Sequence, residues 1–133
     1  MSQMDTDAFD ALAAEQCISL TTFRRDGTAV PTPVWAAPSG GKLLVWTGVD
    51  SGKVKRLRHT PAVTVAPCER GGSLLDEPVA AHARVTRRDE MPALKAAMKA
   101  KYGWQFRFAA LAAGIGRLIG LRPGQIGVEI TLD

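Results

Sequence analysis

The chain has 133 residues, of which 46% are hydrophobic and 23% are charged. This balance is ordinary for one globular domain with its own core, and it excludes disordered, fibrous and collagen-like proteins. The formal net charge of +4 suits an anionic ligand at least as well as a nucleic acid, because nucleic-acid modules usually show a broader basic face with exposed aromatic side chains. We therefore predict a single domain over residues 1–133 and no nucleic-acid partner.

Metal, secretion and membrane signals are weak in this sequence. Cys17 and Cys68 lie far apart, without a CxxC spacing or a nearby histidine pair, which argues against a zinc site and a disulfide framework. The first residues are acidic and lack an apolar signal region, and the apolar segment FRFAALAAGIGRLIGL is interrupted by Arg107 and Arg117. We expect no metal, no membrane partner and a reducing, cytoplasmic location.

The first half of the chain shows a helical pattern followed by alternating ones. Asp5 or Thr6 is a suitable N-cap for a helix that covers one end of the core. Asp26-Gly27 marks a tight hairpin turn and the PSGG sequence marks the next turn, so three consecutive strands are predicted to form a meander. The elements predicted here are a helix over 5–16 and strands over 17–23, 28–37 and 42–47.

The second half alternates between short helices and strands. Asp89 is a suitable N-cap and Gly103 a suitable residue just past the end of the longer helix. This order of elements predicts a mainly β (α+β) fold, in which a six-stranded, mostly antiparallel sheet closes into a small barrel with short helices at its ends. The elements predicted here are helices over 51–59 and 89–102 and strands over 62–68, 77–87 and 126–132.

The segment WTGVDSGKVKRLRHTP places a serine, two glycines and four basic residues directly after a strand. In a helix that starts at Ser51, Val54 and Leu57 share an inward face and the basic side chains spread outward. The serine hydroxyl, the free N–H groups of the first turn and the charge of Lys53 suit a phosphate. The alternative for this stretch is a solvated basic face without a ligand.

The segment TAVPTPVWAA carries the second signal. Pro31, Pro33 and Trp35 share one face of a strand, and because proline cannot donate to a ladder the segment belongs at a sheet edge or a bulge. Unpaired backbone there suits the edge of a flat heterocycle, whereas a protected edge strand without a ligand is the alternative. Together with the phosphate site, this strand describes the two ends of a nucleotide-like ligand.

Over nearly the whole chain, and most specifically over residues 17–72, the sequence resembles the flavin and deazaflavin split β-barrel superfamily related to pyridoxamine 5′-phosphate oxidase. It is most similar to the branch of coenzyme F420-dependent oxidoreductases, through its strand, turn and Ser-x-Lys-x-Lys arrangement. The resemblance implies that the segment after the third strand holds the cofactor phosphate, that the second strand lies along the ring, and that the third and fourth strands border the pocket. The residues so implied are Ser51, Lys53, Lys55 and Arg56 for the phosphate, Pro33, Val34 and Trp35 for the ring, and Trp46, Thr47, Ala66, Pro67 and Cys68 for the border.

The chain departs from the oxidases of this superfamily at one informative position. Those that hold FMN typically carry an arginine directly after the serine, where this chain has Gly52, and they have an arginine-bearing C-terminal extension, whereas this sequence ends at GVEITLD. The resemblance therefore favours coenzyme F420, with FMN as the alternative cofactor. Extra positive charge at Lys55, Arg56 and Arg58 suits a deazaflavin whose tail carries several carboxylates.

The resemblance also implies a homodimer with cofactor sites at the interface. The apolar segment 104–120 is our candidate for a pocket lid or an interface, and an ordinary core helix is the alternative.

By resemblance, the reduced deazaflavin passes a hydride to a small electron-poor acceptor, and the protein orients the partners and excludes water. No catalytic side chain is identified. His59 and His82 are the weak candidates for a proton donor, and Cys68 is better explained as a small buried strand residue than as a nucleophile. The rival functions are a non-catalytic carrier of coenzyme F420 and a small basic barrel that binds nucleic acid.

Overall fold

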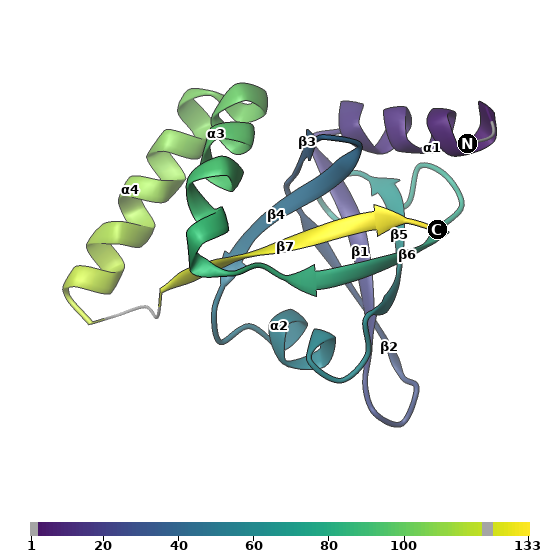
Figure 1. The fold of residues 1–133 in the computed structure, drawn as a ribbon, viewed down its shortest axis with the longest axis horizontal. Coiled ribbons are helices and arrows are strands. Elements are labelled where there is room, and N and C mark those ends of the chain that lie inside the picture. Colours follow the sequence, from purple (N-terminus) through teal and green to yellow (C-terminus); the bar gives the residue numbers. More distant parts are fainter. Residues whose placement is uncertain (1–2, 121–123) are drawn as a thin grey trace.

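The computed structural model describes residues 3–120 and 124–133, and Figure 1 shows its arrangement as a curled antiparallel sheet with helices around it. The strands are β1 (Cys17–Phe23), β2 (Ala29–Val34), β3 (Ala36–Ser39), β4 (Lys42–Gly48), β5 (Ala62–Cys68), β6 (Val79–Val85) and β7 (Gln125–Leu132). The helices are α1 (Gln3–Ala14), α2 (Gly52–Leu57), the short 3-10 helix η1 (Arg88–Glu90), α3 (Met91–Tyr102) and α4 (Trp104–Leu118).

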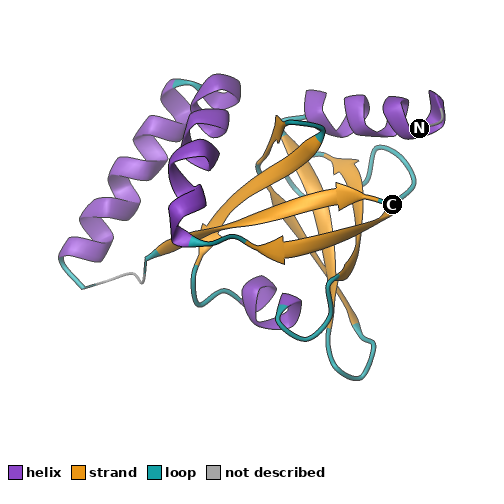
Figure 2. Ribbon diagram, viewed as in Figure 1, coloured by secondary structure: helices purple, strands orange, loops and turns teal. Residues whose placement is uncertain are grey.

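The sheet has seven strands in the order β2-β1-β5-β6-β7-β4-β3, so the six-strand prediction was wrong by one. The predicted strand over 28–37 is interrupted at Trp35, where its first part leaves β1 and its second part joins β4. Since β2 and β3 form opposite edges of the sheet and only Trp35 joins them, the sheet must curl until these edges meet. The mainly β, antiparallel barrel-like architecture predicted from the sequence is confirmed (Figure 2).

The first hairpin has the predicted turn. The N–H of Gly27 donates to the Arg24 carbonyl at 2.9 Å, and the Asp26 carboxylate accepts the Thr28 N–H at 2.9 Å. Gly27 has a φ of 91°, a conformation that favours glycine. The predicted three-stranded meander is wrong, because β2 pairs with β1 and only the continuation β3 pairs with β4.

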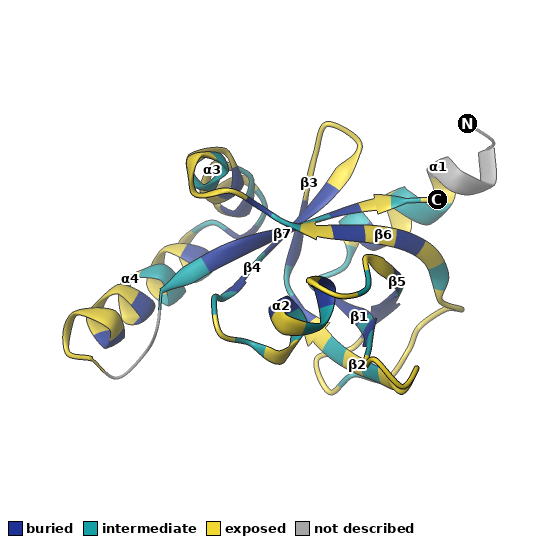
Figure 3. Cartoon of the chain, turned by 60° about the horizontal axis from the view of Figure 1, so that its bottom comes forward, coloured by how far each residue is buried: buried dark blue, intermediate teal, exposed yellow. Residues whose placement is uncertain are grey.

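The main core lies inside the curled sheet. It gathers inward-facing residues of β1, β5, β6, β7 and β4, with Leu12 of α1 at one end and Leu57 of α2 at the other. Helix α1 covers one end of the barrel, as predicted, although it starts at Gln3, so that Asp5 and Thr6 lie within the helix rather than at its N-cap. Figure 3 shows this alternation of buried and exposed residues along the strands.

A second core lies outside the barrel, between the β3–β4 hairpin and the α3–α4 pair. Leu94, Met98, Tyr102 and Phe106 pack there on Ala37 and Leu44. Gly103, with a φ of 59°, separates the two helices at the predicted end of α3, whereas Asp89 falls within η1 and not at the N-cap. These two helices therefore cover a face of the sheet and not an end of the barrel, in contrast to the sequence prediction.

Candidate functional site

Helix α2 sits at the end of the barrel, at the point where β4 ends. Ser51 is its N-cap, and the Ser51 hydroxyl accepts the Val54 N–H at 3.4 Å. The Thr47 hydroxyl, near the end of β4, lies 3.5 Å from the Ser51 hydroxyl oxygen. Val54 and Leu57 are buried, as the spacing predicts, so the apolar side of the helix fixes the position of its polar side.

The basic side chains of α2 are not equivalent. Arg56 turns back toward the barrel, where its Nε donates to the Thr22 hydroxyl at 2.6 Å. Its guanidinium lies over the first turn of the helix, so that a Cβ at Gly52 would stand only 2.6 Å from Nη1. The missing side chain of Gly52 thus makes room for the guanidinium of Arg56.

Lys53 is the second half-buried cation of this end of the barrel. Burial lowers the pKa of Lys53 from its ordinary value, and the nearby charge of Arg56 lowers it further. Lys55 and Arg58 are exposed. Within the described chain no carboxylate forms an ion pair with Lys53, Lys55, Arg56 or Arg58.

The polar and basic side chains at this end of the barrel form the cationic site, which consists of Thr47, Ser51, Lys53 and Arg56. It offers two hydroxyls and two half-buried cations whose mutual repulsion an anion would relieve. A phosphate or carboxylate group is the chemistry that such donors bind. The predicted phosphate residues are therefore adjacent in space, with Lys55 at the exposed margin.

The predicted ring residues lie further along the barrel. β2 is an edge strand, as its prolines predict, because it pairs with β1 alone. Pro33 lies opposite Ser19 of β1 and is exposed, whereas the Val34 side chain faces the core. Ser19 is three residues from Thr22 on β1, about 10 Å at the rise of a strand. Because the separation is an odd number of residues, the Pro33 and Thr22 side chains also lie on opposite faces of the sheet. Contact of one ligand with both places therefore requires a molecule that extends along the barrel, from its end onto its outer face.

The predicted fourth-strand residues are buried beside that place. In the register, Ala66 lies opposite Ser19 and Cys68 lies opposite Cys17. The loop after β5 folds back over them. The backbone of Cys68 forms an isolated antiparallel β-bridge with Leu74, and the Leu75 N–H donates to the Pro67 carbonyl at 2.9 Å. Both cysteines are free, and burial raises the pKa of the Cys68 thiol, which agrees with a structural role for this residue.

Trp35 and Trp46 belong to the outer core rather than to the cationic site. Trp35 stacks on Tyr102 with ring centroids 4.7 Å apart, at the break between β2 and β3. The Tyr102 hydroxyl accepts the Ala36 N–H at 2.9 Å and donates to the Gln16 carbonyl at 2.8 Å. Burial raises the pKa of Tyr102 to about 12, so the phenol stays protonated and holds the break together.

Trp46 faces away from Thr47, because neighbouring side chains of a strand point to opposite faces. Its ring meets the edge of Phe106 from α4, with centroids 5.2 Å apart. The structure therefore places Trp46 and Thr47 on opposite faces of β4, although the resemblance groups both at the border of the pocket.

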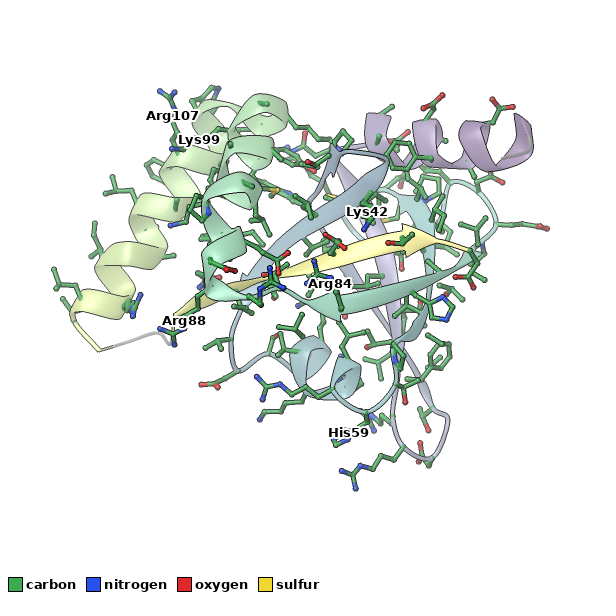
Figure 4. All side chains as sticks on the ribbon, viewed as in Figure 1. Lys42, His59, Arg84, Arg88, Lys99 and Arg107 are labelled. Carbon is green, nitrogen blue, oxygen red and sulfur yellow. The ribbon has the colours of Figure 1, made fainter. Side chains whose placement is uncertain are left out.

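The two histidines lie outside the cationic site. The His59 ring contacts Arg25 at 3.1 Å (Figure 4), and His82 of β6 pairs with Asp133, the residue after β7. Sequence reasoning missed Thr22, which orients Arg56, since a threonine within a strand carries no local signal of such a contact.

A small antiparallel barrel that is closed at one end by a cationic helix, with a helical pair on one face, defines this protein as a split β-barrel. The family described as pyridoxamine 5′-phosphate oxidase matches residues 4–126. The chain therefore belongs to the pyridoxamine 5′-phosphate oxidase family.

Solved structures share this fold at low sequence identity. The conserved hypothetical protein Rv2991 from Mycobacterium tuberculosis is 18% identical, with a TM-score of 0.65 over 99% of this chain and 81% of its own. HutZ, the heme storage protein of Vibrio cholerae, is 13% identical, with a TM-score of 0.65 over 99% and 92%. An FAD-binding protein from Mesorhizobium loti is 14% identical, with a TM-score of 0.62 over 100% and 89%. No curated protein sequence matches the chain significantly.

None of the helices within residues 3–120 and 124–133 combines the length and the hydrophobicity that a membrane span requires. No group of three or more histidine, cysteine, aspartate or glutamate side chains is arranged to hold a metal ion in the same part of the chain.

Proposed function

We propose that this protein is an oxidoreductase that uses coenzyme F420 to transfer a hydride to or from a small organic acceptor. The observation that carries the proposal is the cationic site, where two half-buried cations without ion-pair partners in the described chain meet two hydroxyls. When bound, a deazaflavin supplies the hydride chemistry, and the protein supplies orientation and charge. In this proposal Lys53 and Arg56 hold the phosphate, and the Ser51 hydroxyl donates a hydrogen bond to one of its oxygens.

The arrangement around Gly52 supports coenzyme F420 over FMN. By resemblance, FMN enzymes place an arginine at this position. Here the guanidinium of Arg56 occupies the space over Gly52 and is held by Thr22. Exposed Lys55 and Arg58 extend the positive charge outward, where a tail of several carboxylates would run. Pro33 on the open edge of β2 is the proposed neighbour of the ring.

Parallel titrations with coenzyme F420 and FMN test this proposal. We expect saturable deazaflavin binding that is at least about tenfold tighter than FMN binding, a difference of about 1.4 kcal/mol. A preference for FMN transfers the protein to the flavin-binding branch, and binding of neither cofactor refutes the cofactor proposal. Oxidation of bound reduced coenzyme F420 by a panel of acceptors separates an enzyme from a non-catalytic carrier.

We also propose that two copies of the chain pair through α4. Five apolar side chains of this helix follow the alternating four- and three-residue spacing of a helix–helix seam, and Ile119 extends it. Each of these six side chains is between 52% and 86% exposed. The alternative interpretation of 104–120 as an ordinary core helix therefore holds only for the inner side of α4, where Phe106, Ala113 and Gly116 are buried. The seam consists of Trp104, Phe108, Leu111, Ile115, Leu118 and Ile119.

The size of this seam favours a second copy as its occupant. Large apolar side chains bury on the order of 100–250 Å² each, so the seam is comparable to the roughly 800 Å² that each partner of a standard interface buries. Single exposed apolar residues need no partner, whereas a continuous patch of this size does. The spacing is self-complementary, as an interface between identical chains requires.

Changing Phe108 and Leu111 to serine tests the pairing. We expect the double variant to raise the dimer dissociation constant by about 100-fold or more, because central apolar residues of an interface contribute about 2 kcal/mol or more each. Sedimentation equilibrium or light scattering measures the mass. Leu75→Ser, which removes an exposed apolar residue far from α4, is the control and should leave the dimer intact. A wild-type protein that is monomeric at high concentration contradicts the pairing.

A further inference from the structure

A cavity lies on the face of β4 that points away from α2, between that strand, the start of β7 and the α3–α4 pair. Its volume is about 340 Å³, which is within the range of small-molecule sites. Trp46 and Val49 form its wall on the β4 side, and Gln125 and Ile126 form part of the β7 side. Because Thr47 points toward α2 and Trp46 points away from it, this cavity is separate from the cationic site.

The helical side of the cavity exists because of small residues on α4. Ala110, Ala113 and Gly114 line it at helical spacing and face Trp46 and Met91. Larger side chains on this face of α4 would fill the space between the helix and the sheet. The cavity thus has an apolar part of its lining that includes an indole ring.

Three cations from three elements also line the cavity. Among the described residues these are Arg88 of η1, Lys95 of α3 and Arg117 of α4, and none of the described lining residues is acidic. None of the three forms an ion pair with a residue in 3–120 or 124–133. The neighbouring carboxylates of Asp89 and Glu90 are engaged elsewhere, by Arg87 and Arg84.

Arg117 is held close to the start of β7. Its guanidinium carbon lies 3.6 Å from the position that a Cβ of Gly124 would take, so the side chain folds back from α4 over the backbone of Gly124. Figure 4 shows Arg88 at the same end of the helical pair, whereas Lys99 and Arg107 lie at the opposite end. Arg88, just before α3, and Arg117, in the last turn of α4, therefore lie at the same end of the helical pair.

The wall of the cavity contains a polar group without a partner. The indole Nε1 of Trp46 is buried and makes no hydrogen bond with the described residues. A buried donor in this state destabilises the fold relative to one that is paired. Because Trp46 lines the cavity, a ligand bound there would contact the ring that carries this unpaired donor.

We propose that this cavity is a second ligand site, which binds a small organic anion with a flat apolar body and one carboxylate or phosphate group. The apolar body packs between Trp46, Met91 and the small residues of α4. The acidic group meets Arg88, Lys95 and Arg117. The proposal does not depend on the identity of the cofactor, because it uses none of the residues of the cationic site.

Binding of 2-naphthoate, compared with its neutral relative 2-naphthamide, tests the proposal. We expect 2-naphthoate to bind saturably and at least about tenfold more tightly than the amide, since only the carboxylate can form charge-assisted hydrogen bonds with the three cations. Nitrogen–proton NMR should show a shift of the Trp46 indole signal, which the Trp46→Phe variant identifies. The Trp35 and Trp104 signals should move much less.

Charge-matched double variants locate the site. Lys95→Gln with Arg117→Gln should weaken 2-naphthoate binding at least about tenfold. Lys99→Gln with Arg107→Gln, which removes the same charge at the other end of the helices, should leave binding unchanged, as should Lys53→Ala. Equal binding of the amide, equal losses in both double variants, loss of binding in Lys53→Ala, or no saturable binding would each overturn the proposal. Unfolding midpoints show whether each variant is folded.

Discussion

Replacing Gly127 with alanine is expected to lower the free energy of unfolding by about 3 kcal/mol, the upper part of the range for overpacking in a core. Gly127 lies on β7 directly beneath α3. An added Cβ would stand 2.2 Å from Cδ1 of Leu94 and 2.7 Å from the Thr86 hydroxyl oxygen. Since Gly127 also accepts the Thr86 N–H at 2.8 Å, the strand cannot move away without losing that bond. Denaturant unfolding measures the loss.

A double variant shows whether steric conflict is the cause. Leu94→Ala alone should cost about 2–5 kcal/mol, because it opens a cavity. In the Gly127→Ala background it should cost clearly less, because the new methyl group uses part of the space. Gly48→Ala, at the end of β4 with open space around its Cβ position, is the control and should change stability little. Additive losses in the double variant would show that contact with Leu94 is not the reason.

Replacing Lys53 with alanine is expected to weaken binding of coenzyme F420 by about 1.5–3 kcal/mol, or roughly 10- to 150-fold. Lys53 is the half-buried cation nearest the N-cap of α2, and burial lowers the pKa of its amine in the free protein. Fluorescence titration measures the affinity. Lys55→Ala removes the same charge from the exposed side of α2 and should cost much less. Similar losses in both variants would mean that binding depends only on the general positive field of the helix.

The lowered pKa of Lys53 also gives this binding a pH dependence. A bound anion favours the charged amine, so the pKa of Lys53 is higher in the complex than in the free protein. The affinity is then greatest below the pKa that Lys53 has in the free protein, and it falls as the pH rises above that value. Between the pKa values of Lys53 in the free protein and in the complex, binding takes up protons. The Lys53→Ala variant should lose this alkaline dependence. If the variant keeps it, another group is responsible.

Much of the secondary structure could be predicted from local sequence. The alternation in 17–23 and 62–68, the Asp26-Gly27 turn and the inward pair Val54 and Leu57 are short-range signals, and the structure confirms them. The break at Trp35 could not be predicted in this way. It depends on β1 and β4, which take the two halves of one extended segment to opposite edges of the sheet, and on Tyr102, which binds the backbone beside the break.

The candidate site was predicted only in part for a similar reason. Ser51, Lys53 and Arg56 are close in sequence, so any short helix brings them together. The contact of Arg56 with Thr22 joins residues far apart in the chain, and a helical pattern carries no information about it. Trp46 and Thr47 are neighbours in sequence, yet they serve opposite faces of β4.

The sequence by itself determined the antiparallel β class, the basic helix after β4 and the proline-bearing edge strand, because periodicity, turn residues and missing N–H donors act over a few residues. Only the tertiary structure decided which way Arg56 points, that α4 presents its apolar seam outward, and that Arg88, Lys95 and Arg117 meet beside Trp46. These features depend on strand register and helix packing between distant segments, and long-range packing leaves no signature in the local order of residues.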